Sequence, residues 1–538
     1  MTSASQADRP EVASLHKDGR PPFTRVLVAN RGEIAVRIIR ACHELGIEAV
    51  AVYSDADAEA GHVRAADVAI RLGPAAPAES YLRADAIVAA ARATGAEAIH
   101  PGYGFLSERA SFARAVESAG LVFIGPDSET IAALGDKLAA RRLASDAGVP
   151  VVPGTLEPAA VDRADGIDAL AAEADRIGYP LLVKAAAGGG GRGMRRVTSR
   201  HELPAALTAG SAEAASAFGD GSVYLEREVL PARHIEVQLM GDAEGSVVAV
   251  GERDCSLQRR HQKLVEEAPA PGLSDDERRE LHAMAVRLGR AARLRNASTA
   301  EFLFDEDRRF WFLEVNTRLQ VEHGVTELAA DVDLVREQLL VAAGRPLSAQ
   351  ILAAAENAAR PTRHAIEVRL SAEDPGRNFA PAPGRIGRWR MPAGPGVRID
   401  TAAEAGDRVP PDYDPLVAKL LVVDIDRLSA IARLGRALDE VEVTGIQTTL
   451  PFHRFVAAHD GFRAGELSTG WVAEEWDAAV GGDRGKALDV ATKAAAATAP
   501  DPTGTTVTSA SRGTPRGPDG PGGWDVAARE DAIDRWPR

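Results

Sequence analysis

Lysine is scarce in this chain, since only seven of the 63 Lys and Arg residues are lysines. Three of the seven, Lys137, Lys184 and Lys263, stand in the stretches with the strongest chemical patterns. An ammonium group is a compact point charge on a thin stem, whereas guanidinium is a broad planar fork. A chain that otherwise uses Arg is therefore expected to keep Lys in crowded anion-binding pockets. The alternative is that a few lysines fell beside glycines by chance.

Cysteine is rarer still, because Cys42 and Cys255 are the only two and have no CxxC spacing. This pattern excludes a disulfide framework and a cysteine zinc site, and it favours a reducing compartment, which predicts a cytoplasmic protein. No run of about eighteen apolar residues occurs, so a membrane-spanning helix is not expected. Residues 1–22 are polar without the apolar core of a signal peptide, and we expect them to form a disordered leader.

Positive charge is in deficit, with a net charge of −15 and a pI near 5.4. Binding to nucleic acid or to an anionic membrane needs clustered positive charge, so neither is expected as a main partner. Small anions remain suitable ligands for local basic pockets. A chain of 538 residues with 45% hydrophobic content is long enough for about three or four globular domains.

From Thr24 onward, short β-branched runs alternate with helical patterns, which predicts βαβ units in a parallel sheet. Strands are expected at 26–29, 49–53, 98–100 and 122–124, and Ile34, Ile38 and Cys42 share one helical stripe. The segment 23–135 is therefore predicted to be a doubly wound α/β domain. The turn at 30–33 lacks the G-x-G-x-x-G spacing of a dinucleotide site, and we interpret it as a strand-to-helix turn.

The remaining chain is predicted to contain three further parts. Residues 136–345 should form one domain, within which 151–225 is an α/β insertion that could move as a lid, and 361–470 should form a β-rich domain. Residues 478–538 are rich in Ala, Thr, Pro and Gly and predict a flexible tail. Within that tail, 524–536 could form a short docking helix, or it could be disordered.

A glycine run follows the predicted strand that ends at Lys184, and it includes Gly190 and Gly191. Consecutive glycines allow backbone N–H groups to approach an anion closely, so we predict a phosphate-binding loop. It is not a Walker A motif, because no Gly-Lys-Ser/Thr follows. A flexible turn without a ligand is the alternative.

A predicted hairpin carries two carboxylates. If Phe304 pairs with Trp311, antiparallel register places Glu301 directly opposite Glu314 on one face. Facing carboxylates repel each other unless a cation lies between them. Asn316 lies two residues further on the same face, so these three residues predict a magnesium site with phosphates completing the shell. Two solvated glutamates on an exposed strand are the alternative.

The alternation continues beyond the hairpin, because polar residues occupy every second position at Glu314, Asn316, Arg318, Gln320 and Glu322. Extended backbone would align these five groups in a row. A half-buried strand with one solvated face would give the same pattern. We favour a functional row, because it combines a metal ligand, a cation and a carboxylate. Lys263, Arg369 and His234 are less informative by themselves, since charge runs are usually solvated and a lone histidine is usually structural.

Together these motifs resemble the biotin carboxylase component of biotin-dependent carboxylases of the acyl-CoA carboxylase type, a branch of the ATP-grasp ligases. The likeness runs from about Arg25 to about Trp471. It is carried by the motifs at 29–35, 100–108, 184–194, 252–269 and 316–323. The resemblance implies an α/β ATP-grasp fold with an N-terminal doubly wound domain, a mobile glycine-loop lid and a β-rich C-terminal domain.

The family uses ATP to convert bicarbonate to carboxyphosphate, which then carboxylates biotin. The resemblance implies ATP-binding residues at Lys137, Lys184, Gly190, Gly191, Glu226, Arg227, Glu228, Val229, His234, Gln258, His261, Glu301, Leu303 and Glu314. It implies Mg²⁺ or Mn²⁺, as two ions, on Glu301, Glu314 and Asn316. It also implies bicarbonate contacts from Lys263, Arg318, Gln320, Val321 and Glu322, with Glu322 as the base and Arg369 at biotin. The catalytic set is then Lys263, Arg318, Glu322 and Arg369.

The chain departs from the family pattern at Ala187, Glu228 and Gly324. No Ala-Met-Lys-Met biotinylation sequence and no carboxyltransferase segment occur. Biotin is therefore expected on a separate carrier protein, which would work with a separate carboxyltransferase subunit, and the enzyme is expected to be a homodimer. The final acceptor stays open between an acyl-CoA, pyruvate and urea, and Lys419 stays unexplained.

Two other functions remain open from the sequence. The chain could be another ATP-grasp ligase that activates a different carboxylate, which Lys263, Arg318, Glu322 and Arg369 together disfavour. It could also be an inactive scaffold that retains the fold, although none of the expected site residues is missing.

Overall fold

The structure is a computed structural model that describes residues 21–159, 161, 164–186 and 194–477. All of these described residues belong to one compact unit. The predicted leader, most of the glycine run with Gly190 and Gly191, and the predicted tail with its docking helix therefore lie outside the described residues.

The N-terminal segment is a parallel sheet with the strand order β3-β2-β1-β4-β5. Its strands are β1 (Arg25–Val28), β2 (Glu48–Ser54), β3 (Val68–Gly73), β4 (Ala98–His100) and β5 (Val122–Phe123), and its helices are α2 (Gly32–Glu44), α3 (Gly61–Ala65), α4 (Ala84–Thr94) and α5 (Ala110–Ser118). The doubly wound prediction is confirmed. The predicted stripe of Ile34, Ile38 and Cys42 is buried in a core that also includes residues of α12 (Leu334–Ala342) and α13 (Ala349–Asn357).

The strand-to-helix turn before α2 has a backbone requirement of its own. Gly32 has a φ of +67°, in the left-handed region that favours glycine. Beside it, the Asn30 Nδ2 atom donates to the carbonyl oxygens of Pro101 and Tyr103, each at 2.7 Å. The turn therefore fixes the loop after β4 as well as the start of α2.

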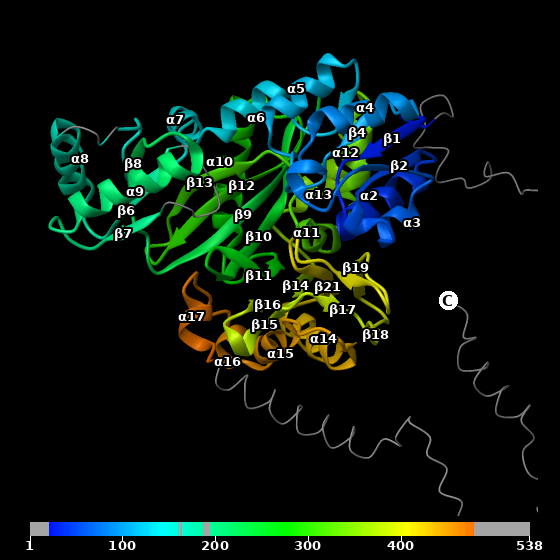
Figure 1. Ribbon diagram of the computed structural model, residues 1–538. Coiled ribbons are helices and arrows are strands. Elements are labelled where there is room, and N and C mark those ends of the chain that lie inside the picture. The colour runs from blue at the N-terminus through cyan, green and yellow to red at the C-terminus, as the bar shows by residue number, and fades with distance from the viewer. Residues whose placement is uncertain (1–20, 160, 162–163, 187–193, 478–538) are drawn as a thin grey trace, which may run out of the picture. The chain divides into compact units, whose positions relative to one another are not determined.

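The glycine-loop region is a small antiparallel sheet, ordered β7-β6-β8. It consists of β6 (Leu181–Ala185), β7 (Arg195–Val197) and β8 (Val223–Arg227), with α8 (Ala164–Ile177) and α9 (Leu203–Phe218). Leu181, Val183 and Leu225 are fully buried beneath these helices in a core of their own. Figure 1 shows this region as a separate lobe in cyan and teal.

A large antiparallel sheet, in the order β13-β12-β9-β10-β11-β14-β21-β19, carries the predicted metal ligands together with Lys263 and Arg369. Its strands are β9 (Ala232–Gly241), β10 (Val247–Arg259), β11 (Gln262–Ala268), β12 (Asn296–Asp305), β13 (Phe310–Asn316), β14 (His364–Ser371), β19 (Val397–Thr401) and β21 (Leu416–Asp424). The pairing of β11 with β14 joins the predicted 136–345 segment to the predicted 361–470 segment. The main strands of both segments thus share one sheet.

The other elements cover this sheet or connect its strands. The helices are α6 (Ser128–Gly135), α7 (Lys137–Asp146), α10 (Asp275–Ala291), α11 (His323–Ala330), α12 (Leu334–Ala342), α13 (Ala349–Asn357), α14 (Arg427–Glu440), α15 (Leu450–Ala458), α16 (Asp460–Ala464) and α17 (Trp471–Glu475). Short strands are β15 (Glu373–Asp374), β16 (Ala380–Pro381), β17 (Gly384–Arg385), β18 (Trp389–Arg390), β20 (Arg408–Val409) and β22 (Glu442–Val443), and η1 (Asp55–Asp57), η2 (Pro77–Glu79) and η3 (Pro375–Arg377) are 3₁₀ turns. None of the described helices has the length and apolar composition needed to cross a membrane.

Candidate active site

The predicted carboxylate pair lies on the β12–β13 hairpin, and Glu301 is directly opposite Glu314 as expected. The predicted pairing of Phe304 with Trp311 is wrong, because Phe304 pairs with Phe310 and Leu303 pairs with Trp311. A register shift between Phe302 and Glu301 accounts for both observations. The extra residue of this bulge lies in β13, a local departure from regular pairing that alternation alone does not reveal.

The oxygens of this hairpin suit a hard divalent cation. Burial and the neighbouring Glu301 raise the pKa of Glu314, so its charge lacks full compensation. The nearest cation is Lys137, whose Nζ atom lies 3.8 Å from Glu314 Oε2. Asn316 is close to the pair, because its Nδ2 atom donates to Glu301 Oε1 at 2.7 Å. Two carboxylates and an amide oxygen are the ligands that Mg²⁺ and Mn²⁺ accept, so the residues present fit the predicted metal.

The extended row predicted after Glu314 is not observed. Strand β13 ends at Asn316 and α11 begins at His323, so the chain turns between them. The polar groups nevertheless converge, because Arg318 donates to Asn316 Oδ1 at 3.0 Å and to Gln320 Oε1 at 2.6 Å. Gln320 in turn donates to Glu301 Oε1 at 3.2 Å. A turn brings together side chains that a straight strand would have spread along its length.

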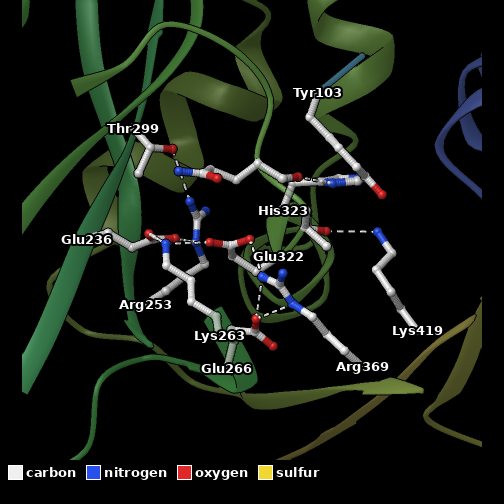
Figure 2. Close-up of polar contacts among 12 residues, drawn as sticks. Tyr103, Glu236, Arg253, Lys263, Glu266, Thr299, Glu322, His323, Arg369 and Lys419 are labelled. Atoms are coloured by element: carbon white, nitrogen blue, oxygen red, sulfur yellow. Dashed lines mark hydrogen bonds and ion pairs between the residues drawn. The ribbon is translucent and has the colours of Figure 1, made fainter. Parts of the chain in front are cut away.

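Lys263 on β11 lies at the centre of a buried ion network (Figure 2). Its Nζ atom donates to Glu236 Oε2 at 2.5 Å, to Glu322 Oε1 at 2.7 Å and to Glu301 Oε1 at 3.0 Å. The three carboxylates are buried, so their charges are held by this contact rather than by water. Although burial would raise it, Lys263, Arg369 and Arg253 together hold the pKa of Glu322 well below its usual range.

Arg369 on β14 is the second cation beside Glu322. It donates to Glu322 Oε2 at 2.9 Å and to Glu266 Oε1 at 2.6 Å. Burial raises the pKa of Glu266 to about 7, despite this contact with Arg369. The β11–β14 pairing brings Arg369 to the same cluster as Lys263, although the two residues are far apart in the sequence.

Glu236 and Arg253, like Glu266, belong to the network but were not predicted as site residues. Arg253 is fully buried and donates to Glu236, to Gln238 Oε1 at 2.8 Å and to Thr326 Oγ1 at 2.9 Å. The signal that could have found them is the alternation of His234, Glu236 and Gln238 along β9, which places three polar groups on one face.

A second group of charges surrounds Lys184, the residue from which the predicted phosphate-binding loop starts. Lys184 and Arg141 both bind Glu226, which is 2% exposed. Burial would raise the pKa of Glu226, but Lys184 and Arg141 lower it. A carboxylate thereby keeps two cations in place at the base of the predicted loop.

His234 belongs to the group of charges around Lys263, through its contact with Glu301. Its Nε2 atom lies 3.0 Å from Glu301 Oε2, and its backbone pairs with Leu303. His234, Glu236 and Glu301 place their ligand atoms close enough together to hold a metal ion. His261 lies at the tip of the β10–β11 turn, and desolvation together with Lys184 and His234 lowers its pKa. Gln258 is buried next to this tip.

The predicted hinge residues after Glu226 make few contacts with this cluster. Arg227 is exposed, Val229 is partly buried, and Glu228 pairs with Arg196 of the glycine-loop sheet at 2.6 Å. None of these contacts brings the side chains of the hinge residues to Lys184 or His234.

The fold, together with this network of cations and carboxylates, defines an ATP-grasp ligase. A sequence model described as carbamoyl-phosphate synthase L chain, ATP binding domain, matches residues 136–350. Models of the biotin carboxylase N-terminal domain and C-terminal domain match residues 22–131 and 367–474. The chain belongs to the biotin carboxylase family of ATP-dependent ligases.

Named relatives and solved structures agree with this assignment. Biotin carboxylase 1 of Bacillus subtilis is 45% identical over 83% of this chain and 97% of its own length. The biotin carboxylase of Haemophilus influenzae is 47% identical over 82% of this chain and 96% of its own. A biotin carboxylase complex from Campylobacter jejuni has a TM-score of 0.80 at 43% identity, covering 84% of this chain and 99% of that one. A Hydrogenobacter thermophilus biotin carboxylase domain dimer, solved with MgADP and bicarbonate, has a TM-score of 0.79 at 42% identity and covers 84% and 97% of the two chains.

Proposed function

We propose that the chain uses ATP and bicarbonate to carboxylate biotin carried by a separate protein, the first half-reaction of a biotin-dependent carboxylase. The observation that carries this proposal is that Glu322 accepts from Lys263 at 2.7 Å and from Arg369 at 2.9 Å. The two cations can bind a small oxyanion, and the buried carboxylate between them can take its proton. The same network reaches Glu301 and hence the metal-binding hairpin.

The nucleotide is assigned to the end of the site that contains Lys137, Lys184 and His234. The ammonium groups would bind the phosphates, with the backbone of residues 226–229, Gln258, His261 and Leu303 around the rest of the nucleotide. Glu301, Glu314 and Asn316 would hold Mg²⁺ or Mn²⁺, which when bound neutralises the charge of the transferring phosphoryl group. Phosphoryl transfer depends mainly on such positioning and neutralisation.

Bicarbonate is assigned to Lys263, Arg318, Gln320, the Val321 backbone and Glu322. In the structure, the Glu322 carboxylate is bonded to Lys263 and Arg369. Bicarbonate competes for these two cations when it binds, and Glu322 becomes more basic because it then shares their positive charge with the new anion. Glu322 then accepts the bicarbonate proton, a bicarbonate oxygen bonds to the γ-phosphorus, and the bond from that phosphorus to the leaving ADP oxygen breaks. The carboxyphosphate formed is labile in water, which explains the use of a lid.

Biotin is assigned to the side of the site where Arg369 lies, because a guanidinium stabilises negative charge on the ureido group as its nitrogen loses a proton. The carrier and the carboxyltransferase are proposed to be separate subunits of a cytoplasmic enzyme, built on a homodimer of this chain. Of two relatives at 47% identity, one from Methanothermobacter thermautotrophicus is named as part of a pyruvate carboxylase, and one from Mycobacterium leprae as part of an acyl-coenzyme A carboxylase. Carboxylation of biotin is common to both, so the acceptor is chosen by the transferase.

The test is ATP hydrolysis by the purified chain with Mg²⁺, with and without bicarbonate and free biotin. The expected result is hydrolysis that requires bicarbonate and rises with biotin. Hydrolysis that ignores bicarbonate would instead support a ligase for another carboxylate. Tight nucleotide binding without turnover under any of these conditions would support a scaffold.

A further inference from the structure

Lys419 is a fully buried lysine on β21 that none of the roles above uses. Its Nζ atom donates to the carbonyl oxygen of Val321 at 2.8 Å and lies 3.1 Å from Glu33 Oε1 and 3.6 Å from Asp400 Oδ2. An ammonium group taken out of water is costly unless its donors and its charge are all satisfied. Three partners from three separate chain segments meet this requirement here. Figure 2 shows Lys419 beside the site, with one of these contacts drawn as a dashed line.

The Val321 carbonyl is part of the peptide bond that precedes Glu322. Since that bond is planar, holding its oxygen fixes the orientation of the Glu322 backbone N–H and constrains its Cα position. Glu322 stands just before α11 and its side chain makes no helix-capping hydrogen bond, so the local helix does not orient the carboxylate. The carboxylate instead points toward Lys263 and Arg369.

We propose that Lys419 is a positioning residue, which holds the Val321 carbonyl and thereby aims the Glu322 carboxylate at Lys263 and Arg369. The inference rests on the proposed function for the role of Glu322 as the base. It goes beyond that function by assigning the buried ammonium on β21 to the same reaction.

The surroundings explain why the residue is a lysine. In the sheet, Lys419 is directly opposite Arg369 on β14 and Asp400 on β19. Glu33, Glu367 and Asp400 are the carboxyl groups that face the ammonium, and burial raises the pKa of Glu33 and Glu367. Arg398, Arg369 and His323 are the neighbouring cationic or titratable groups. Although burial would lower it, the three carboxylates raise the pKa of Lys419, so the charge is kept. A second guanidinium beside Arg369 would not fit this enclosed position.

A purely structural role would require only that Lys419 neutralise Glu33 and Asp400. That role predicts a loss of stability without a selective effect on bicarbonate. The positioning role predicts a selective loss, because the sheet and side-chain partners of Lys419 include none of the nucleotide residues that the structure describes.

The experiment compares wild type, Glu33→Gln and the double variant Lys419→Met/Glu33→Gln. The double variant removes both members of the Lys419–Glu33 ion pair, so the buried Glu33 carboxylate is not left without its cation, and it should fold more readily than Lys419→Met alone. Glu33→Gln is the matched control, because it keeps the bond from Lys419 to Val321. We measure the melting temperature, the Kd for MgADP, kcat/KM for bicarbonate in ATP hydrolysis, and hydrogen exchange of the peptide that covers 319–325.

The double variant is expected to keep its affinity for MgADP and to lose about 10²-fold in kcat/KM for bicarbonate, the scale of a misplaced catalytic group. Exchange at 319–325 should be faster in the double variant than in Glu33→Gln. Equal kcat/KM and equal exchange in the two variants would overturn the inference, as would a parallel loss of MgADP affinity. If wild type itself lacked bicarbonate dependence, the proposed function would fail, and the role of Lys419 as a positioning residue for a base would fail with it, whatever the exchange result.

Discussion

Replacing Glu322 by glutamine tests the proposed base directly. The carboxylate and the amide have almost the same shape, but the amide cannot accept a proton from bicarbonate. The two cations remain compensated, because Lys263 keeps Glu236 and Glu301 while Arg369 keeps Glu266. The variant is therefore expected to fold and to bind nucleotide as wild type does.

The magnitude follows from the role assigned to the carboxylate. Loss of a positioned general base typically costs about 10²- to 10⁴-fold in rate. Because Lys263 and Arg369 would bind bicarbonate more freely once Glu322 no longer competes, KM for bicarbonate should not rise. The loss is thus expected mainly in kcat, whereas the Kd for MgADP should stay within about twofold of wild type, the scale of a change of about 0.5 kcal/mol.

The assay is steady-state ATP hydrolysis with bicarbonate as the varied substrate, together with calorimetric titration of MgADP. Glu108→Gln is a matched control, because Glu108 Oε2 lies 3.0 Å from Arg318 Nε but is 41% exposed. An exposed ion pair contributes about 0–1 kcal/mol, so this control should lose no more than about fivefold. If Glu322→Gln turned over bicarbonate within tenfold of wild type, the reasoning about the base would be refuted.

Three further outcomes are expected. Glu314→Gln should raise the Mg²⁺ concentration for half-maximal turnover by about 10- to 100-fold, as for weakened metal sites, and an unchanged requirement would contradict the metal assignment. Gly324→Ala should lower the melting temperature, because its Cβ would lie 2.4 Å from Leu421 Cδ2. Such overpacking costs about 1–3 kcal/mol, and Leu421→Val should restore part of the loss; a Gly324→Ala variant as stable as wild type would refute this. His62 is fully buried and burial lowers its pKa to about 4. The free energy of unfolding that neutral His62 contributes is complete above pH 6.5 and is lost as pH falls toward 4, by up to about 3 kcal/mol. The urea midpoint of His62→Gln should therefore fall less steeply than that of wild type between pH 6.5 and pH 4. Parallel curves for the two proteins would argue against this.

Local patterns predicted most of what depends on near neighbours in the sequence. The α2 stripe was found from periodicity alone. The facing pair of Glu301 and Glu314 was predicted from an assumed pairing of Phe304 with Trp311, and the pair is correct only because the bulge in β13 offsets that wrong register. The bulge in β13 and the turn after Asn316 were missed, because period two continues through both without a break in the residue types.

Contacts between distant strands were beyond such patterns. The pairing of β11 with β14 brings Arg369 to Glu322, and no local signal in either strand specifies its partner. Lys419 illustrates the same limit, since an isolated lysine in an apolar strand gives no sign that three remote acceptors will surround it. The resemblance supplied the expected residues, and the structure shows the neighbours, such as Glu236 and Arg253, that hold them.

The eight-stranded sheet combines strands that precede and strands that follow the segment between Asn357 and His364. A cut there would leave one fragment ending in an unpaired β11 edge and another with an unpaired β14 edge. Each fragment alone would present a strand edge that promotes aggregation, but the two edges are complementary in register. Reassociation of the fragments would rebuild the contact between Arg369 and Glu322, so enzyme activity would report fragment complementation.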